Sequence, residues 1–291
     1  MRARDLLAHI KEQIAAHVRA EELDPIAGWL LEHLTGLNKT ALIINDPVNW
    51  TPAEEASLSS ISGRLAQQEP IQHILGYGVF YGRDFEVGPA VLIPRPETEE
   101  LVHWVLSLHK AGDTLLDIGT GSGCIPITLA AEGKFEQIAG LDVSVDAIQI
   151  ANNNARRHDV KINWILGDIL IGDIPLSGLD FVVSNPPYIR EQERKEMQPN
   201  VLNYEPGLAL FVADDDPLLF YRRIALLALE RLRPGGHLLF EINEAFGKEM
   251  KELLAGMGYI HIELRKDMQG KDRMIKGQTP LQKTTNPPEQ A

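Results

Sequence analysis

The sequence contains very little cysteine and no long run of apolar residues. Its single cysteine, Cys124, excludes an internal disulfide framework and a cysteine-rich metal site, so we assign no metal ligands. A chain with so little cysteine is typical of a reducing compartment, and we expect a cytoplasmic protein. No segment approaches the roughly 18 consecutive apolar residues of a membrane span, which predicts no membrane partner.

The chain also lacks an excess of basic residues. Its 291 residues carry a formal net charge of −13, whereas tight binding to bulk nucleic acid needs a cationic surface. We therefore expect no direct nucleic-acid binding, while a protein partner with a basic face remains compatible with this charge. The hydrophobic content of 44% is that of a globular protein, and the length allows one large domain or two ordinary ones.

Residues 1–75 are predicted to form a small helical bundle. Apolar residues recur at helical spacing between positions 6 and 18. Asp24-Pro25 and Thr51-Pro52 each place a capping side chain before a proline, which is typical of a helix start. The bundle is either a structural cap or a domain that docks a partner, since the sequence shows no chemistry in it. Glycines mixed with aromatic and β-branched residues then predict a β-hairpin linker over 76–92.

From about residue 113 the sequence alternates between strand and helix patterns. This alternation predicts an α/β domain with a mostly parallel sheet and helices on both faces. The polar, proline-containing tail 278–291 is expected to be disordered. The predicted strands are 113–118, 136–142, 161–166, 179–184, 236–242, 258–264 and 273–277, and the predicted helices are 122–133, 144–157, 217–232 and 244–256.

A glycine-rich loop joins the first predicted strand of this domain to its first helix. The apolar run Leu115-Leu116-Asp117-Ile118 leads into Gly119-Thr120-Gly121-Ser122-Gly123. Glycine tolerates positive φ and lets a ligand approach the backbone closely. The spacing differs from the G-x-G-x-x-G dinucleotide fingerprint. Taken alone the loop is weak evidence for a ligand, because a tight strand-to-helix turn has the same composition.

Acidic residues end the next two predicted strands. Asp142 lies about 20 residues beyond the loop, where an acidic side chain can accept both ribose hydroxyl hydrogens. Alone it would be read as a cap for the helix that starts near Ser144. Together with the glycine loop it indicates a nucleoside-bearing ligand. Asp168 can accept from an adenine amino group while Ile169 covers the ring, although an ordinary turn residue explains Asp168 almost as well.

The fourth predicted strand ends in a stiff turn, Ser184-Asn185-Pro186-Pro187-Tyr188. Two prolines fix their own φ, donate no backbone N–H and hold the preceding residue extended. Open α/β sheets bind ligands at this end of their strands. The turn presents an amide, carbonyls without competing N–H groups and an aromatic face. This set suits a flat acceptor that bears N–H donors, such as an amide or an exocyclic amine.

The glycine loop, Asp142 and the proline turn, in this order, resemble the motifs of a class I S-adenosylmethionine-dependent methyltransferase. The Asn-Pro-Pro-Tyr turn resembles the form that the fourth of these motifs has in members that methylate amino groups. The segment Ile93-Pro94-Arg95-Pro96-Glu97-Thr98-Glu99 resembles the peptide chain release factor N5-glutamine methyltransferase family, as do 70–76, 204–206 and 272–273. The resemblance covers roughly residues 1–277. It implies a Rossmann-like, seven-stranded methyltransferase domain over 93–277, preceded by a helical substrate-docking bundle and a β-hairpin linker.

The resemblance also implies the reaction and its residues. A methyl group would pass from S-adenosylmethionine, leaving S-adenosylhomocysteine, to the N5 amide nitrogen of the glutamine in the Gly-Gly-Gln motif of release factors. We expect a monomer and no general base. Catalysis would depend on acceptor oxygens of Asn185 and Pro186 and on stacking by Tyr188. The implied cofactor residues are Gly119, Thr120, Gly121, Ser122, Gly123, Asp142, Asp168, Ile169 and Asn185, and the implied substrate residues are Leu92, Arg95, Asn185, Pro186, Pro187 and Tyr188.

Other functions fit parts of this pattern. An adenine-N6 methyltransferase acting on DNA or RNA would use the same turn on a flipped base, but the negative net charge and the lack of a basic recognition segment weigh against it. A glutamine of another protein, such as a ribosomal protein, is a second possible acceptor. A cofactor-binding fold used only as an assembly factor is the non-enzymatic alternative.

Overall fold

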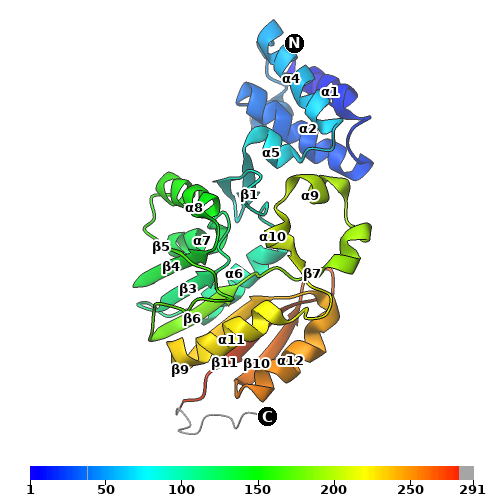
Figure 1. Cartoon of the computed structure of the whole chain (residues 1–291). Helices are drawn as coiled ribbons and strands as arrows, with labels where there is room; N and C mark the ends of the chain where they lie inside the picture. The colour runs from blue at the N-terminus through cyan, green and yellow to red at the C-terminus, as the bar shows by residue number, and fades with distance from the viewer. Residues whose placement is uncertain (38, 282–291) are drawn as a thin grey trace. The chain divides into compact units, whose positions relative to one another are not determined.

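The computed structural model describes residues 1–37 and 39–281 (Figure 1). The chain divides into two compact units. Unit 1 comprises Met1–Gly76 together with Gln198–Tyr204, and unit 2 comprises Tyr77–Met197 and the chain from Glu205 onward. Among the described residues, no helix is long and apolar enough to cross a membrane.

Unit 1 is a bundle of short helices, which confirms the predicted helical character. It contains α1 (Ala3–Ile14), α2 (Ala20–Thr35), α3 (Lys39–Ile44), α4 (Pro52–Leu65), α5 (Ile71–Leu75) and α9 (Pro199–Tyr204). The apolar stripe of α1 is fully buried against apolar residues of α2 and α4, because helical spacing places its members on one face. The buried residues are Leu6, Ile10, Ile14, Ala27, Leu30, Leu31, Leu58, Ile61, Leu65 and Ile71.

The two predicted helix starts in unit 1 have different outcomes. Thr51 caps α4 as expected, since its Oγ1 accepts from the Ala53 N–H at 3.2 Å and its own N–H donates to Glu54 at 2.9 Å. The start at Asp24 is wrong, because α2 begins at Ala20 and Pro25 lies inside it. Glutamates in the first turn favour the earlier start. Pro25 is then the sixth residue of α2, where it removes one N–H donor from the helical hydrogen bonding.

Unit 2 is built on a seven-stranded sheet, as the predicted α/β fold requires. It opens with a hairpin of β1 (Tyr77–Phe80) and β2 (Arg83–Glu86), which pair antiparallel. The sheet order is β10-β11-β9-β6-β3-β4-β5; all neighbours pair in parallel except β11, which is antiparallel to both β9 and β10. The strands are β3 (Thr114–Ile118), β4 (Gln137–Asp142), β5 (Asn163–Leu166), β6 (Leu179–Ser184), β9 (Leu232–Glu241), β10 (Ile260–Lys266) and β11 (Asp272–Gln278).

Helices cover both faces of this sheet (Figure 1). Successive side chains of a strand point to opposite faces, so Leu115 and Phe181 pack with α6 (Pro96–Leu108) and α7 (Cys124–Glu132), whereas Leu116 and Val182 pack with α11 (Leu219–Arg231) and α12 (Gly247–Gly256). The remaining helix of the domain, α8 (Val145–Arg157), contacts β4 and β5. All six residues of β6 are buried, as expected for a central parallel strand.

Several short elements between β6 and α11 were absent from the predicted pattern. They are β7 (Ile189–Arg190), the 3-10 helix η1 (Glu191–Glu196), α10 (Gly207–Leu210), β8 (Phe211–Val212) and α9 of unit 1; a second 3-10 helix, η2 (Glu244–Phe246), precedes α12. Elements this short show no hydrophobic periodicity. Gln278, the first residue of the predicted tail, ends β11, and residues 282–291 lie outside the described residues.

Candidate active site

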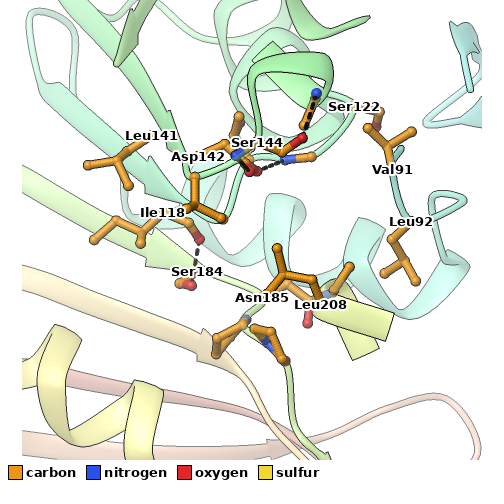
Figure 2. Close-up of a pocket in the computed structure, with 18 of the residues that line it drawn as sticks. Val91, Leu92, Ile118, Ser122, Leu141, Asp142, Ser144, Ser184, Asn185 and Leu208 are labelled. Atoms are coloured by element: carbon orange, nitrogen blue, oxygen red, sulfur yellow. Dashed lines mark hydrogen bonds between the residues drawn. The ribbon is translucent and has the colours of Figure 1, made fainter. Parts of the chain in front are cut away.

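A cavity of about 320 Å³ opens at the carboxyl ends of the central strands of unit 2 (Figure 2). β3 pairs with β4 on one side and with β6 on the other, so the strand order reverses here. Such a reversal leaves a crevice where open α/β sheets bind ligands. Residues from the ends of β3, β4 and β6 line the cavity, together with the segments 90–95, 167–170 and 206–209.

The glycine loop forms one wall of the cavity. Gly119, Gly121 and Gly123 have positive φ values of 74°, 53° and 78°, which side chains rarely allow. Gly119, Thr120, Gly121 and Ser122 line the cavity, but Gly123 is not among the lining residues. A Cβ on Gly123 would lie 2.9 Å from Ile127 and 3.0 Å from Trp164. Gly123 therefore allows close helix packing, and the cofactor contact implied for it stays a prediction.

Asp142 lies at the end of β4 and lines the cavity beside the loop. Its Oδ2 accepts from the Gly121 N–H at 2.8 Å, and its Oδ1 accepts from the Ser144 N–H at 2.9 Å (Figure 2). Burial raises the pKa of this carboxyl, and the backbone N–H donors oppose the rise. The side chain thus holds the glycine loop against the start of α8, and each oxygen keeps a second lone pair for a ligand hydroxyl.

Asp168 and Ile169 follow β5 and also line the cavity. Asp168 Oδ1 accepts from the Leu170 N–H at 2.9 Å, a local bond typical of a turn. Ile169 is 7% exposed and belongs to the core on the α11 side of the sheet. Both predicted positions therefore lie at the cavity, and Ile169 contributes an apolar surface that is fixed by packing.

The proline turn closes the cavity at the end of β6. Ser184 Oγ donates to the Ile118 carbonyl at 2.6 Å and so joins the ends of β6 and β3 (Figure 2). Asn185, Pro186 and Pro187 line the cavity, whereas Tyr188 does not. The Tyr188 hydroxyl donates to Glu241 Oε1 at 2.9 Å.

The segment before α6 forms the opposite rim, and Leu92 and Arg95 both line the cavity. Arg95 Nη2 donates to Glu205 Oε1 at 2.6 Å, while the Ile93 N–H donates to Glu205 Oε2 at 3.1 Å. The Glu205 side chain is 1% exposed. A buried carboxylate thus fixes this segment, and Arg95, implied above as a substrate residue, forms an ion pair with it. Leu208 also lines the cavity and is 64% exposed, facing the same opening.

Asp117 is a feature that motif reading did not single out. It lies in β3 two residues before Gly119 and is fully buried, and neither carboxyl oxygen has a hydrogen-bond partner among the described residues. Burial raises its pKa to about 7, and the nearby Thr120 hydroxyl opposes this only in part. A buried carboxyl without a donor is costly to ionise, and Asp117 is not among the residues that line the cavity. The sequence signal that could have singled out Asp117 is its position just before the glycine loop.

Thr98 and Glu241 are two further residues that connect to the proline turn. Thr98, in the first turn of α6, lines the cavity, and its hydroxyl donates to Glu241 Oε2 at 2.6 Å. Glu241 ends β9 and is 1% exposed. Cys124 also lines the cavity, and burial raises the pKa of its thiol to about 12, so it stays protonated. Among the described residues no group of three or more His, Cys, Asp or Glu side chains is placed to hold a metal ion.

The sequence matches two known families. Residues 5–76 match the PrmC N-terminal domain, and residues 77–203 match the Methyltransferase small domain. Over 271 residues the chain is 40% identical to the release factor glutamine methyltransferase of Bacteroides thetaiotaomicron, covering 93% of this chain and 98% of that protein. The chain belongs to the release factor glutamine methyltransferase family. The protein of the same name from Flavobacterium psychrophilum is 41% identical to this methyltransferase, with 91% and 95% of the two chains covered.

Solved structures share the fold of this methyltransferase. The hMettl16 catalytic domain, solved in complex with MAT2A 3'UTR hairpin 6, superposes with a TM-score of 0.55 at 18% identity, covering 83% of this chain and 86% of that one. At this identity the likeness concerns the fold alone. It agrees with the seven-stranded sheet described above.

The contrast between two loop glycines is testable by substitution. Gly123→Ala places a Cβ against Ile127 and Trp164, whereas Gly121→Ala meets nothing within 4 Å. Both changes incur left-handed strain, and overpacking adds about 1–3 kcal/mol at Gly123. We expect the Gly123→Ala variant to have the lower free energy of unfolding in a chemical denaturation series without ligand. Equal stability of the two variants would contradict the packing role of Gly123.

Asp117 predicts a pH-dependent stability. Its pKa is about 7 in the folded protein against 3.8 for a free side chain, so ionising it opposes folding and the free energy of unfolding falls as pH rises through this range. Asp117→Asn removes the titration. At each pH we compare the melting temperature of the ligand-free variant with that of the parent protein. We expect this difference to be about 5 °C more favourable to the variant at pH 8 than at pH 5. A melting-temperature difference that is the same at both pH values would show that Asp117 ionises normally.

Proposed function

We propose that this enzyme transfers a methyl group from S-adenosylmethionine to the N5 side-chain nitrogen of the glutamine in the Gly-Gly-Gln motif of peptide chain release factors. The supporting observation is the cavity, where the Asn185-Pro186-Pro187 turn faces a glycine loop and a ribose-binding acid in a chain of the release factor glutamine methyltransferase family. Family membership favours the release factor over a ribosomal protein as the acceptor.

The cavity residues fit S-adenosylmethionine by their chemistry. Asp142 has free lone pairs for ribose hydroxyls, and Ile169 offers an apolar surface to an adenine ring. Positive φ at Gly119 and Gly121 leaves the loop backbone open to a ligand. When bound, S-adenosylmethionine supplies an electrophilic methyl group on a positively charged sulfur.

The proline turn supplies what an amide acceptor needs. An amide nitrogen is a poor nucleophile because its lone pair is delocalised into the carbonyl, so it must be held and turned. Asn185 Oδ1 and the Pro186 carbonyl are acceptors at the cavity wall, and neither proline offers a competing N–H. They would accept both amide N–H groups and aim the lone pair into the cavity, so catalysis depends on positioning. The methylated nitrogen is acidic enough to lose its proton without a dedicated base.

Adenine in DNA or RNA is the second acceptor with a matching pair of N–H donors. No observation on this chain favours it, and the net charge of −13 opposes a polyanionic substrate. A protein acceptor with a basic face is favoured by the same charge.

We also propose that residues 1–75 dock the release factor. Ile43 and Ile44 in α3 are 70% and 62% exposed, and neighbouring apolar side chains of this size are costly to leave uncovered. An Ile43→Ser, Ile44→Ser double variant should raise the KM for the release factor about tenfold and leave kcat unchanged. The matched control is Met268→Ser in unit 2, where the side chain is 87% exposed. An unchanged KM in the double variant would remove this patch from the docking surface.

The acceptor is tested with radiolabelled S-adenosylmethionine, offered with a release factor, with ribosomes and with plasmid DNA in separate reactions. We expect label on the release factor alone, and none when its Gly-Gly-Gln glutamine is replaced. Label on DNA or on ribosomal RNA would sink the proposal, and label on a ribosomal protein would move it to another glutamine.

Asn185→Ala tests the amide-holding role. The variant should bind S-adenosylmethionine with nearly the parent affinity, measured by calorimetry, because the loop and the acids are untouched. Its kcat should fall on the order of 100-fold, because the acceptor nitrogen is no longer oriented. Full turnover in this variant would show that the turn does not hold the acceptor.

A further inference from the structure

Asn185 is the outermost member of a chain of hydrogen bonds that runs into the protein core. Asn185 Nδ2 donates to Thr98 Oγ1 at 3.3 Å, and the Thr98 hydroxyl donates to Glu241 Oε2 at 2.6 Å. The other oxygen of Glu241 accepts from the Tyr188 hydroxyl at 2.9 Å. Thr98 is 3% exposed and Glu241 is 1% exposed, so water competes little for these bonds. One buried carboxylate thus connects to the side chains of both Asn185 and Tyr188 in the turn.

The donors and acceptors in this series of hydrogen bonds are fixed by the charge of Glu241. An ionised carboxylate only accepts hydrogen bonds, and a hydroxyl has a single proton to donate. Once Thr98 gives that proton to Glu241, it can only accept from Asn185. The amide of Asn185 must then present its NH2 group to Thr98, which turns its oxygen away from Thr98. Glu241 therefore selects one of two amide orientations that have almost the same shape.

Opposing groups act on the Glu241 carboxyl. Burial, the largest cause, raises its pKa and the charge of Glu97 adds to the rise, while the hydrogen bonds from Thr98 and Tyr188 and the charge of Arg273 oppose it. Burial together with the charge of Glu241 keeps the pKa of Tyr188 above its usual value, so the phenol stays a donor. The surroundings thus supply donors and a cation to a carboxylate that would otherwise be costly to bury.

We propose that Glu241 is a positioning residue, which acts through Thr98 to hold the Asn185 side-chain oxygen toward the acceptor amide. This inference rests on the proposed function, because the oxygen matters only if the acceptor presents N–H groups. If the side-chain amide of Asn185 were reversed, its NH2 group would face the N–H groups of the methyl acceptor, and no hydrogen bond could form between them. Glu241 itself contacts neither reactant.

A nearly isosteric change separates this role from simple core packing. In Glu241→Gln the new Nε2 can donate to Thr98, which frees the Thr98 proton for Asn185 Oδ1 and reverses the amide. Thr98→Val keeps the side-chain shape and removes the hydroxyl, whereas Thr98→Ser keeps the hydroxyl. Tyr221→Phe is the matched control, because the Tyr221 hydroxyl donates to the Glu241 backbone carbonyl at 3.1 Å and not to its carboxylate.

The kinetic experiment measures kcat for release-factor methylation and the Kd of S-adenosylmethionine for each full-length variant. Glu241→Gln and Thr98→Val should lose kcat on the order of 100-fold, with Kd changed less than about threefold. Thr98→Ser and Tyr221→Phe should keep kcat within about threefold of the parent protein. Parent-like kcat in Glu241→Gln, or equal losses in Thr98→Val and Thr98→Ser, would overturn the inference.

A second readout does not depend on the acceptor. The side-chain amide NMR signal of Asn185, identified by its loss in Asn185→Asp, should show one proton protected from solvent exchange in the parent protein and neither protected in Glu241→Gln. Identical protection in both proteins would overturn the positioning role. If the parent protein fails to label release factors while the NMR contrast holds, the proposed acceptor fails and the orientation of Asn185 stands.

Discussion

The site depends on the parallel pairing of β3 with β6. The paired residues of the two strands are 66 positions apart in sequence, and the Ser184 hydroxyl joins the strand ends by donating to the Ile118 carbonyl. This pairing sets the glycine loop and the proline turn side by side, so that a Cβ on Gly119 would lie only 4.0 Å from the Asn185 carbonyl oxygen. A shift of register by one residue would move both motifs off the cavity.

Three buried carboxyl groups surround this junction, and each is stabilised differently. Glu205 pairs with Arg95 and a backbone N–H, and Glu241 accepts from two hydroxyls near Arg273. Asp117 has no such donor among the described residues. Glu205 therefore strengthens the rim, Glu241 orders the turn, and Asp117 leaves the free protein less stable than it would be with a neutral side chain.

Much of the fold and the cavity wall could be predicted because their signals are local. The run Leu115–Gly123 carries the signals of a strand and of its glycine loop in nine consecutive residues, and Asp142 lies at the expected distance beyond it. Thr98 and Glu241 lie 143 residues apart, and no spacing rule connects them. The motif also does not show that a Cβ on Gly123 would meet Ile127 and Trp164, because those contacts come from the packing of the folded domain. The predicted helix start at Pro25 was wrong because several start signals lie close together, and the glutamates upstream of Pro25 favour the earlier start of α2.

The two consecutive prolines of the turn have a further consequence for the entropy of binding. A flexible loop must lose backbone freedom when it grips a substrate, and that loss weakens affinity. Pro186 and Pro187 have fixed φ already in the unfolded chain, so folding itself orders them cheaply and binding orders them no further. The φ angles of these two residues are therefore fixed before any substrate binds. The backbone entropy lost on binding then falls less on this turn than on a flexible partner loop.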